Sequence, residues 1–133
     1  MTSEIVDNLA PTYLNKRHSI RYKLDVPLRV ILQKPGSTMI RDGRGTEISE
    51  SGMCVMSGLE LRVGEEVEIE FTLPYSGEPI RVSAAVRNRN GYHYGCKFNA
   101  DSQREQQDVM RLRQILQTFA VEAHEQTVDS RLL

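Results

Sequence analysis

The sequence has no tryptophan, only two cysteines and almost no net charge. Seventeen basic and eighteen acidic residues give a net charge of −1, whereas a general nucleic-acid binder carries a clear excess of positive charge. Two cysteines are too few for a cysteine-rich zinc site, and we expect Cys54 and Cys96 to be small buried side chains rather than a disulfide or redox pair. No run approaches 18 apolar residues, so membrane insertion is not expected.

Signatures of catalysis and of secretion are also missing. The chain contains no G-x-S-x-G, H-E-x-x-H or Walker-type loop, and the spacing of its three histidines is not typical of a metal site. Residues 1–17 contain no apolar stretch of signal-peptide length. We therefore expect a cytoplasmic protein that is not an enzyme and that needs no metal or cofactor.

The composition is that of one soluble globular domain. Of the 133 residues, 39% are apolar and 26% are charged, which provides enough apolar side chains for a core. The charge is unevenly distributed, because residues 15–23 hold four basic residues and no acid, while residues 60–70 hold five glutamates and one arginine. The basic segment is therefore a local candidate for binding an anion.

Apolar and polar residues alternate in four segments in the middle of the chain, which is typical of half-buried strands. The pair Asn90-Gly91 predicts a two-residue hairpin turn, since both residue types tolerate a positive φ. Weaker strands are expected near residues 39–48 and 52–57. The four alternating apolar sets are Val26, Leu28, Val30 and Leu32; Val67, Ile69, Phe71 and Leu73; Ile80, Val82, Ala84 and Val86; and Tyr92, Tyr94, Cys96 and Phe98.

The apolar spacing near the C-terminus changes to the three- and four-residue intervals of an amphipathic helix. Ser102 and Glu105 have the spacing of a capping box, so we predict a helix over about 103–124, followed by a polar tail over 125–133. The apolar stripe comprises Val109, Leu112, Leu116, Phe119 and Ala123.

The order of about six short strands and one helix predicts a mainly β fold. We expect a six-stranded antiparallel β-barrel over about residues 22–99, because closing the sheet removes exposed strand edges. The C-terminal α-helix would cover an open end or face of this barrel. Residues 1–14 are expected to be a flexible N-terminal arm, and residues 15–124 to form the single domain.

Two short motifs provide the evidence for a function. Arg17 and Arg21 lie four residues apart ahead of the first strong strand, and guanidinium groups suit phosphates and the O6/N7 edge of guanine. About 25 residues later, Glu47, Ser49 and Gly52 bridge two predicted strands as E-x-S-x-x-G. A carboxylate can accept from a guanine N1–H/N2–H edge, and a glycine lets backbone approach closely, although the segment also reads as a polar β-turn.

In order and spacing these motifs resemble the PilZ domain family, the bacterial receptors for cyclic di-GMP. That family carries R-x-x-x-R ahead of its first strand and [D/N]-x-S-x-x-G between its second and third, on a six-stranded antiparallel barrel with a C-terminal helix. The resemblance covers about residues 16–120. It implies a stand-alone cyclic di-GMP receptor that changes conformation on binding and signals to an effector protein in motility, biofilm or virulence control.

The resemblance assigns ligand contacts by position. Arg17 and Arg21 match the paired arginines, while Ser49 and Gly52 match the second motif. Glu47 stands where the family has Asp or Asn, and its extra methylene bears on affinity more than on fold. Two further candidate contacts are Lys16, which precedes the arginine pair, and Arg87, whose outward guanidinium would flank a guanine.

Three other classes of function compete with this reading. The first is a PilZ-fold protein-interaction module that does not bind the nucleotide, which Glu47 favours. A small oligonucleotide-binding barrel is disfavoured by the near-neutral charge and the absence of tryptophan, and an enzyme by the missing catalytic motifs. Met110 and Ile115 lie partly off the helical stripe and are candidates for a dimer contact, so we expect a monomer or a ligand-dependent dimer.

Overall fold

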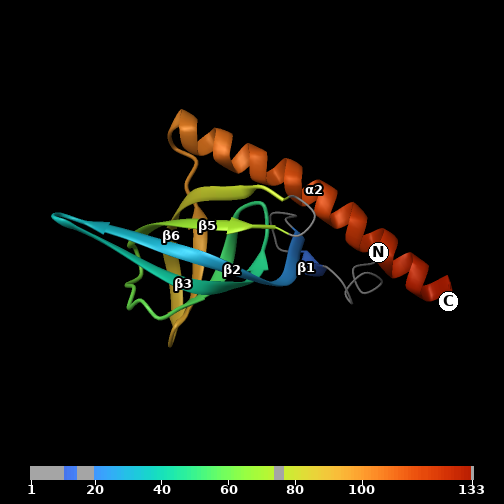
Figure 1. Ribbon diagram of the computed structural model, residues 1–133, viewed down its shortest axis with the longest axis horizontal. Helices are drawn as coiled ribbons and strands as arrows, with labels where there is room; N and C mark the ends of the chain where they lie inside the picture. The colour runs from blue at the N-terminus through green and yellow to red at the C-terminus, as the bar shows by residue number, and fades with distance from the viewer. Residues whose placement is uncertain (1–10, 15–19, 74–76, 133) are drawn as a thin grey trace.

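The computed structural model describes residues 11–14, 20–73 and 77–132, with side chains described over 20–73 and 77–118. In these ranges, seven strands are followed by one helix (Figure 1). The elements are β1 (Pro11–Leu14), β2 (Ile20–Lys34), β3 (Ser37–Ile48), β4 (Gly52–Ser57), β5 (Glu66–Thr72), β6 (Pro79–Asn90), β7 (His93–Phe98) and α2 (Gln103–Leu132).

Strands β2 to β7 form a closed antiparallel barrel, which confirms the predicted fold class. The strand order is β2-β3-β4-β7-β6-β5, and the ring closes where Leu28–Ile31 of β2 pair with Glu68–Phe71 of β5. The earlier part of β2 pairs instead with β1, which is a seventh strand outside the ring. Residues 11–14 were expected to belong to a flexible arm; they are a strand because β2 begins before β5 reaches it and offers them a free edge.

Alternating side chains build the core of the barrel as the sequence predicted. The inward positions of all three predicted sets are buried, while their neighbours are partly or fully exposed except Ile31 of β2, which is also buried. The fourth set holds for Tyr94, Cys96 and Phe98, but Tyr92 was wrongly included, since 53% of its surface is exposed. It lies in the β6–β7 turn, where Asn90 pairs with His93, so the turn residues are Gly91 and Tyr92 rather than Asn90 and Gly91.

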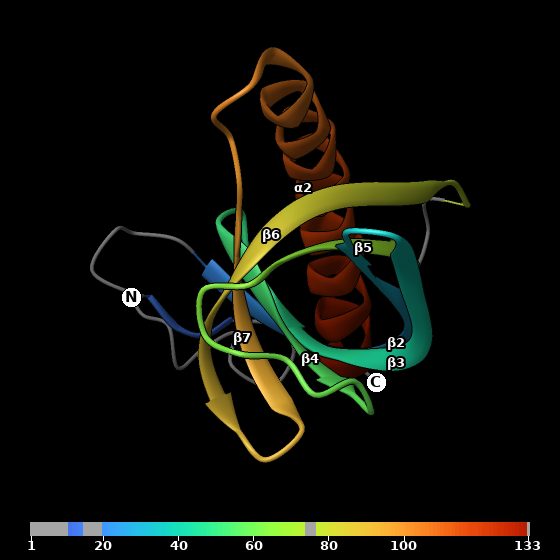
Figure 2. The same ribbon diagram turned by 90° about the vertical axis from the view of Figure 1, so that its left-hand side faces the viewer.

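The helix α2 closes the core from the side of the barrel away from the tip of the β2–β3 hairpin (Figure 2). Val109, Leu112 and Leu116 are buried in the same cluster as the barrel interior, which confirms this part of the predicted stripe. The predicted stripe residues Phe119 and Ala123 lie outside the described side chains. The helix continues to Leu132, so it does not end near residue 124 as predicted.

The helix begins at a capping box, as the sequence predicted. The backbone amide of Glu105 donates to the Ser102 hydroxyl at 3.0 Å, and the Ser102 amide donates to the Glu105 carboxylate at 3.0 Å. The Ser102 amide and the Asp101 amide both donate to the Glu105 carboxylate, and these hydrogen bonds hold the pKa of Glu105 below its usual value. Within the described ranges, α2 has no stretch apolar enough to span a membrane.

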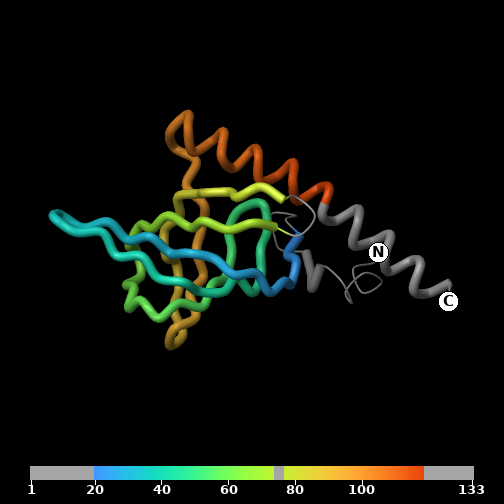
Figure 3. Tube along the Cα trace, viewed as in Figure 1, coloured from blue at the N-terminus to red at the C-terminus, as the bar shows by residue number. Residues whose placement is uncertain are grey.

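One hairpin extends well beyond the barrel (Figure 3). Residues 33–42 of β2 and β3 are exposed, and β3 pairs with β4 only from Gly43 onward. This projecting ribbon carries Arg41 on its surface, and Arg41 is not among the residues that line the cavity on the barrel wall.

Candidate functional site

A cavity of about 440 Å³ opens on the wall of the barrel at the turn that joins β3 to β4. Its lining comes from five strands that are consecutive in the ring, β2, β3, β4, β7 and β6. Its charged and polar side chains come from four of these strands and from the β3–β4 turn: Arg21, Glu47, Ser49, Ser51, Arg87, Asn88 and Lys97.

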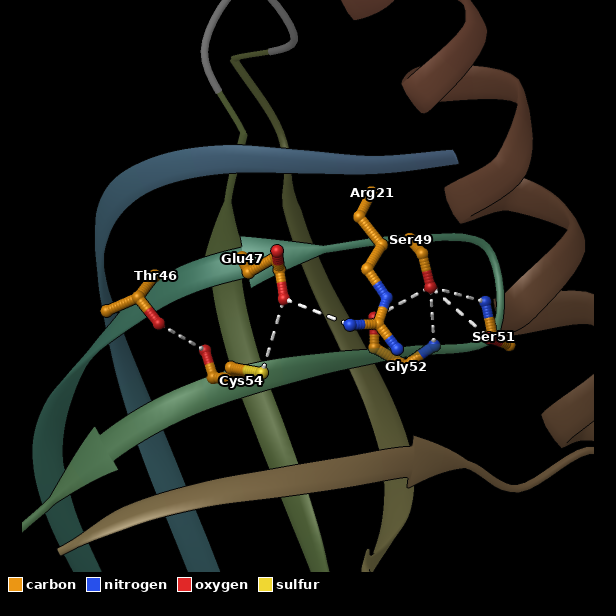
Figure 4. A network of polar contacts seen from close by, with 7 residues as sticks. All are labelled: Arg21, Thr46, Glu47, Ser49, Ser51, Gly52 and Cys54. Atoms are coloured by element: carbon orange, nitrogen blue, oxygen red, sulfur yellow. Dashed lines mark hydrogen bonds and ion pairs between the residues drawn. The ribbon is translucent and has the colours of Figure 1, made fainter. Parts of the chain in front are cut away.

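Glu47 connects the charged groups on one rim of the cavity (Figure 4). Its Oε1 lies 3.8 Å from Nη1 of Arg21, and the Cys54 thiol donates to the same oxygen at 3.6 Å. Strand β2 brings Arg21 to this position because Tyr22, its neighbour, packs into the core and turns the arginine outward. Tyr22 is 9% exposed and belongs to the core, so its ring packs inside the barrel and is not offered to a base.

The two cysteines have different surroundings, and both thiols are free. Burial raises the pKa of the Cys54 thiol, the nearby Glu47 carboxylate raises it further, and Arg21 opposes this effect. Burial raises the pKa of the Cys96 thiol to about 12, with a smaller contribution from Cys54. Both thiols are therefore protonated at neutral pH and poor nucleophiles, as expected for side chains that mainly pack.

Ser49 organises the β3–β4 turn through its hydroxyl. Its Oγ accepts from the backbone amides of Ser51 at 3.2 Å and Gly52 at 3.3 Å, and its own amide donates to the Gly52 carbonyl at 2.8 Å. The side chain is only 6% exposed. Outside the turn, Arg113 of α2 lies 3.6 Å from the Glu50 carboxylate. The polar-turn reading of this motif is thus correct, and the same turn forms an edge of the cavity.

Gly52 is required by close packing between strands. It pairs with Lys97 of β7, and a Cβ atom at this position would lie 2.2 Å from the Cys96 carbonyl oxygen. No side chain fits at that distance without moving backbone. The glycine therefore lets β7 approach the turn at this edge of the cavity.

A β-bulge in β6 shapes the opposite rim. Val86 pairs with Cys96 and Asn88 pairs with the next residue back along β7, Gly95, so Arg87 is the extra residue. The bulge places Arg87 and Asn88 on the outer face together, although strict alternation would turn Asn88 inward. A Cβ on Gly95 would lie 2.6 Å from the Asn88 side chain, so the glycine makes room for the bulged residue.

The structure brings together most of the residues predicted to bind a ligand. Arg21, Glu47, Ser49, Gly52 and Arg87 all line the cavity. The remaining two, Lys16 and Arg17, lie outside the described residues. Sequence reasoning missed Asn88 and Lys97, for which the only signal was the outward parity of Lys97 on its strand. Among the described residues, no group of acidic, histidine or cysteine side chains is arranged to hold a metal ion.

Comparisons with known proteins agree with this fold. Residues 15–116 match the PilZ domain, and no curated protein sequence gives a significant match. The PilZ domain with c-di-GMP of YcgR from Escherichia coli has 18% identity and a TM-score of 0.62, covering 85% of this chain and 98% of that one. The PilZ domain of CeSA from a cellulose-synthesizing bacterium has 22% identity and a TM-score of 0.57, covering 73% and 97%.

A third solved structure is longer than this chain. Apo MrkH of K. pneumonia has 21% identity and a TM-score of 0.60, with 84% of this chain covering 54% of that one. These structural likenesses establish the barrel fold, and the match over residues 15–116 establishes the family. The chain belongs to the PilZ domain family, a family of cyclic di-GMP-binding signalling proteins whose domains are generally non-catalytic binding modules.

Proposed function

We propose that this protein is a cytoplasmic receptor for cyclic di-GMP. One observation carries the proposal: Arg21 of the first motif and Glu47, Ser49 and Gly52 of the second line the same cavity. Its volume of about 440 Å³ lies within the roughly 300–1,000 Å³ typical of small-molecule sites.

The rim formed by Arg21 and Glu47 offers both donors and acceptors. The Glu47 carboxylate would accept from the N1–H and N2–H groups of a guanine, while the Arg21 guanidinium would donate to a phosphate or to the O6/N7 edge. The Ser49–Gly52 turn holds this rim in place through the backbone hydrogen bonds of the serine. Each charge-assisted hydrogen bond to the ligand contributes roughly 1.5–3 kcal/mol, so two arginines supply much of a micromolar affinity.

The output of the receptor is proposed to be a protein contact. Arg17 and Lys16 would join the ligand from the segment ahead of β2, so that ligand binding reshapes the surface next to the cavity. Such a change creates or hides a docking site for an effector protein. This mode of action needs no catalytic group, which fits a family of binding modules.

Isothermal titration calorimetry with cyclic di-GMP tests the proposal. The wild type is expected to bind with micromolar affinity, and Arg17→Ala and Arg21→Ala to weaken binding roughly 10- to 100-fold each. Arg41→Ala is the matched control, because it removes an exposed arginine of the projecting hairpin and should leave binding unchanged. No heat from the wild type at tens of micromolar protein would reject the proposal.

A second candidate is a PilZ-fold interaction module that does not bind the nucleotide. It is favoured by the ion pair between Glu47 and Arg21, which neutralises the arginine within the protein at the position where the family has Asp or Asn. If the wild type does not bind cyclic di-GMP and the Glu47→Asp variant does, this candidate is supported and the loss of binding is due to the length of the Glu47 side chain. Silence of both forms would leave protein interaction as the function to pursue.

A further inference from the structure

We propose that Arg87 of β6 and Lys97 of β7 form a phosphate-binding subsite on the rim of the cavity opposite Glu47. The inference rests on the proposed cyclic di-GMP function and assigns Arg87 to a phosphate instead of the guanine contact expected from the sequence. It also adds Lys97, which the sequence motifs do not reach, to the binding residues.

Among the three basic side chains that line the cavity, Arg87 and Lys97 are the two without an ion pair in the described part of the chain. Nine basic side chains of the described ranges form ion pairs with carboxylates, including Arg21 in the same cavity. Arg87 and Lys97 also line the cavity, yet neither has an ion pair or a side-chain hydrogen bond within the described part of the chain. This rim therefore carries two positive charges that form no ion pair with an acidic side chain of the described residues.

The strand register explains why these two charges have no acidic partner on the neighbouring strands. On either side, Lys97 pairs with a small residue, Gly52 of β4 and Ala85 of β6, so no acidic side chain can face it across the ladder. Arg87 lies two residues beyond Ala85 on the same outer face, which makes it the diagonal neighbour of Lys97. Alternation already turns Arg87 outward, and the bulge turns Asn88 to the same face, over Gly95.

The chemistry of the two rims differs accordingly. On the Glu47 rim, a carboxylate and a guanidinium are already matched, and a neutral base with donors and acceptors can exchange for that pairing. On the Arg87 rim, two unmatched cations favour an anion that both can contact. Lysine binds phosphate as a point charge and arginine as a fork, whereas the edge of a neutral base would leave the lysine charge unused. One phosphodiester group of the ligand satisfies both.

Calorimetry with cyclic di-GMP at low salt tests the subsite through charge-removing variants. Arg87→Gln and Lys97→Gln are each expected to weaken binding about 5- to 20-fold, whereas Arg41→Gln removes one exposed positive charge outside the cavity and should change it less than about twofold. Lys97→Arg keeps the charge and should restore binding. The differences should shrink toward about twofold in 0.5 M NaCl, because the pair is exposed and screened.

A second measurement separates this inference from the proposed function. Amide shifts are followed by NMR while inorganic pyrophosphate is added to the wild type, and Lys97 and Arg87 are expected to shift more than Arg41. Cyclic di-GMP binding with equal affinity for Lys97→Gln and Arg41→Gln would overturn the subsite while sustaining the receptor function. Pyrophosphate shifts at the subsite without cyclic di-GMP binding would sustain the subsite and reject the receptor function. Absence of both overturns both.

Discussion

Gly52→Ala tests whether the close approach of β4 and β7 supports both the barrel and the site. The added Cβ would lie 2.2 Å from the Cys96 carbonyl oxygen, which is roughly 1 Å short of ordinary contact. The atom it meets belongs to the backbone, so the two strands must separate locally, and the hydrogen bond from the Phe98 amide to the Ser51 carbonyl, now 2.8 Å, would lengthen. Overpacking of this kind costs about 1–3 kcal/mol of unfolding free energy.

Gly58→Ala is the matched control at the other end of β4. A Cβ at Gly58 meets no atom within 4 Å, and its φ lies outside the left-handed region, so the free energy of unfolding should stay unchanged or rise by up to about 1 kcal/mol. Urea unfolding followed by far-UV circular dichroism measures both variants. Equal unfolding free energies for Gly52→Ala and Gly58→Ala would refute the argument that Gly52 is needed for packing.

Three further predictions concern the core, the buried thiol and the rim of the cavity. Tyr94→Phe should lower the unfolding free energy by about 1–3 kcal/mol in urea, because the phenol donates to the Leu59 carbonyl at 2.7 Å and accepts from the Leu61 amide at 3.0 Å; no loss would contradict this role. Because the folded state raises the pKa of Cys96 to about 12 from a usual value of 9.0, its contribution to stability is complete below pH 9 and is lost as the pH rises toward 12. Relative to wild type, Cys96→Ala should therefore show a shallower fall of the unfolding free energy between pH 9 and 12, and parallel curves would disprove this. Glu47→Asp should tighten or restore cyclic di-GMP binding in calorimetry, since the shorter carboxylate weakens the ion pair with Arg21; weaker binding would show that the glutamate length is preferred.

Most of the barrel could be predicted from the sequence because its strands alternate cleanly between core and surface. The C-terminal helix was equally readable from its capping box, where Ser102 and Glu105 exchange hydrogen bonds. The β6–β7 turn was predicted one residue too early. Asn90-Gly91 has the composition of a two-residue hairpin turn, but Asn90 pairs with His93, so Gly91 is the first of the two turn residues. The strand at residues 11–14 depends on the free edge of β2, which is a tertiary feature without a local signal.

The residues of the candidate site that belong to short motifs could be predicted from the sequence. Those whose position depends on the register between strands could not. Arg21, Glu47 and Gly52 stand in short motifs with recognisable chemistry, and all three line the cavity. Asn88 escaped prediction because a single extra residue in β6 reverses its direction, and alternation cannot reveal a bulge. Lys97 escaped because its importance comes from the small residues that flank it on neighbouring strands.

The most direct test of the central claim is an amide chemical-shift map of the ¹⁵N-labelled protein during titration with cyclic di-GMP. The account predicts that the largest shifts fall on the cavity, at Arg21, Gly52, Gly95 and Lys97, while Arg41 on the projecting hairpin stays unchanged. Shifts confined to other faces of the barrel, or no shifts at saturating nucleotide, would contradict it.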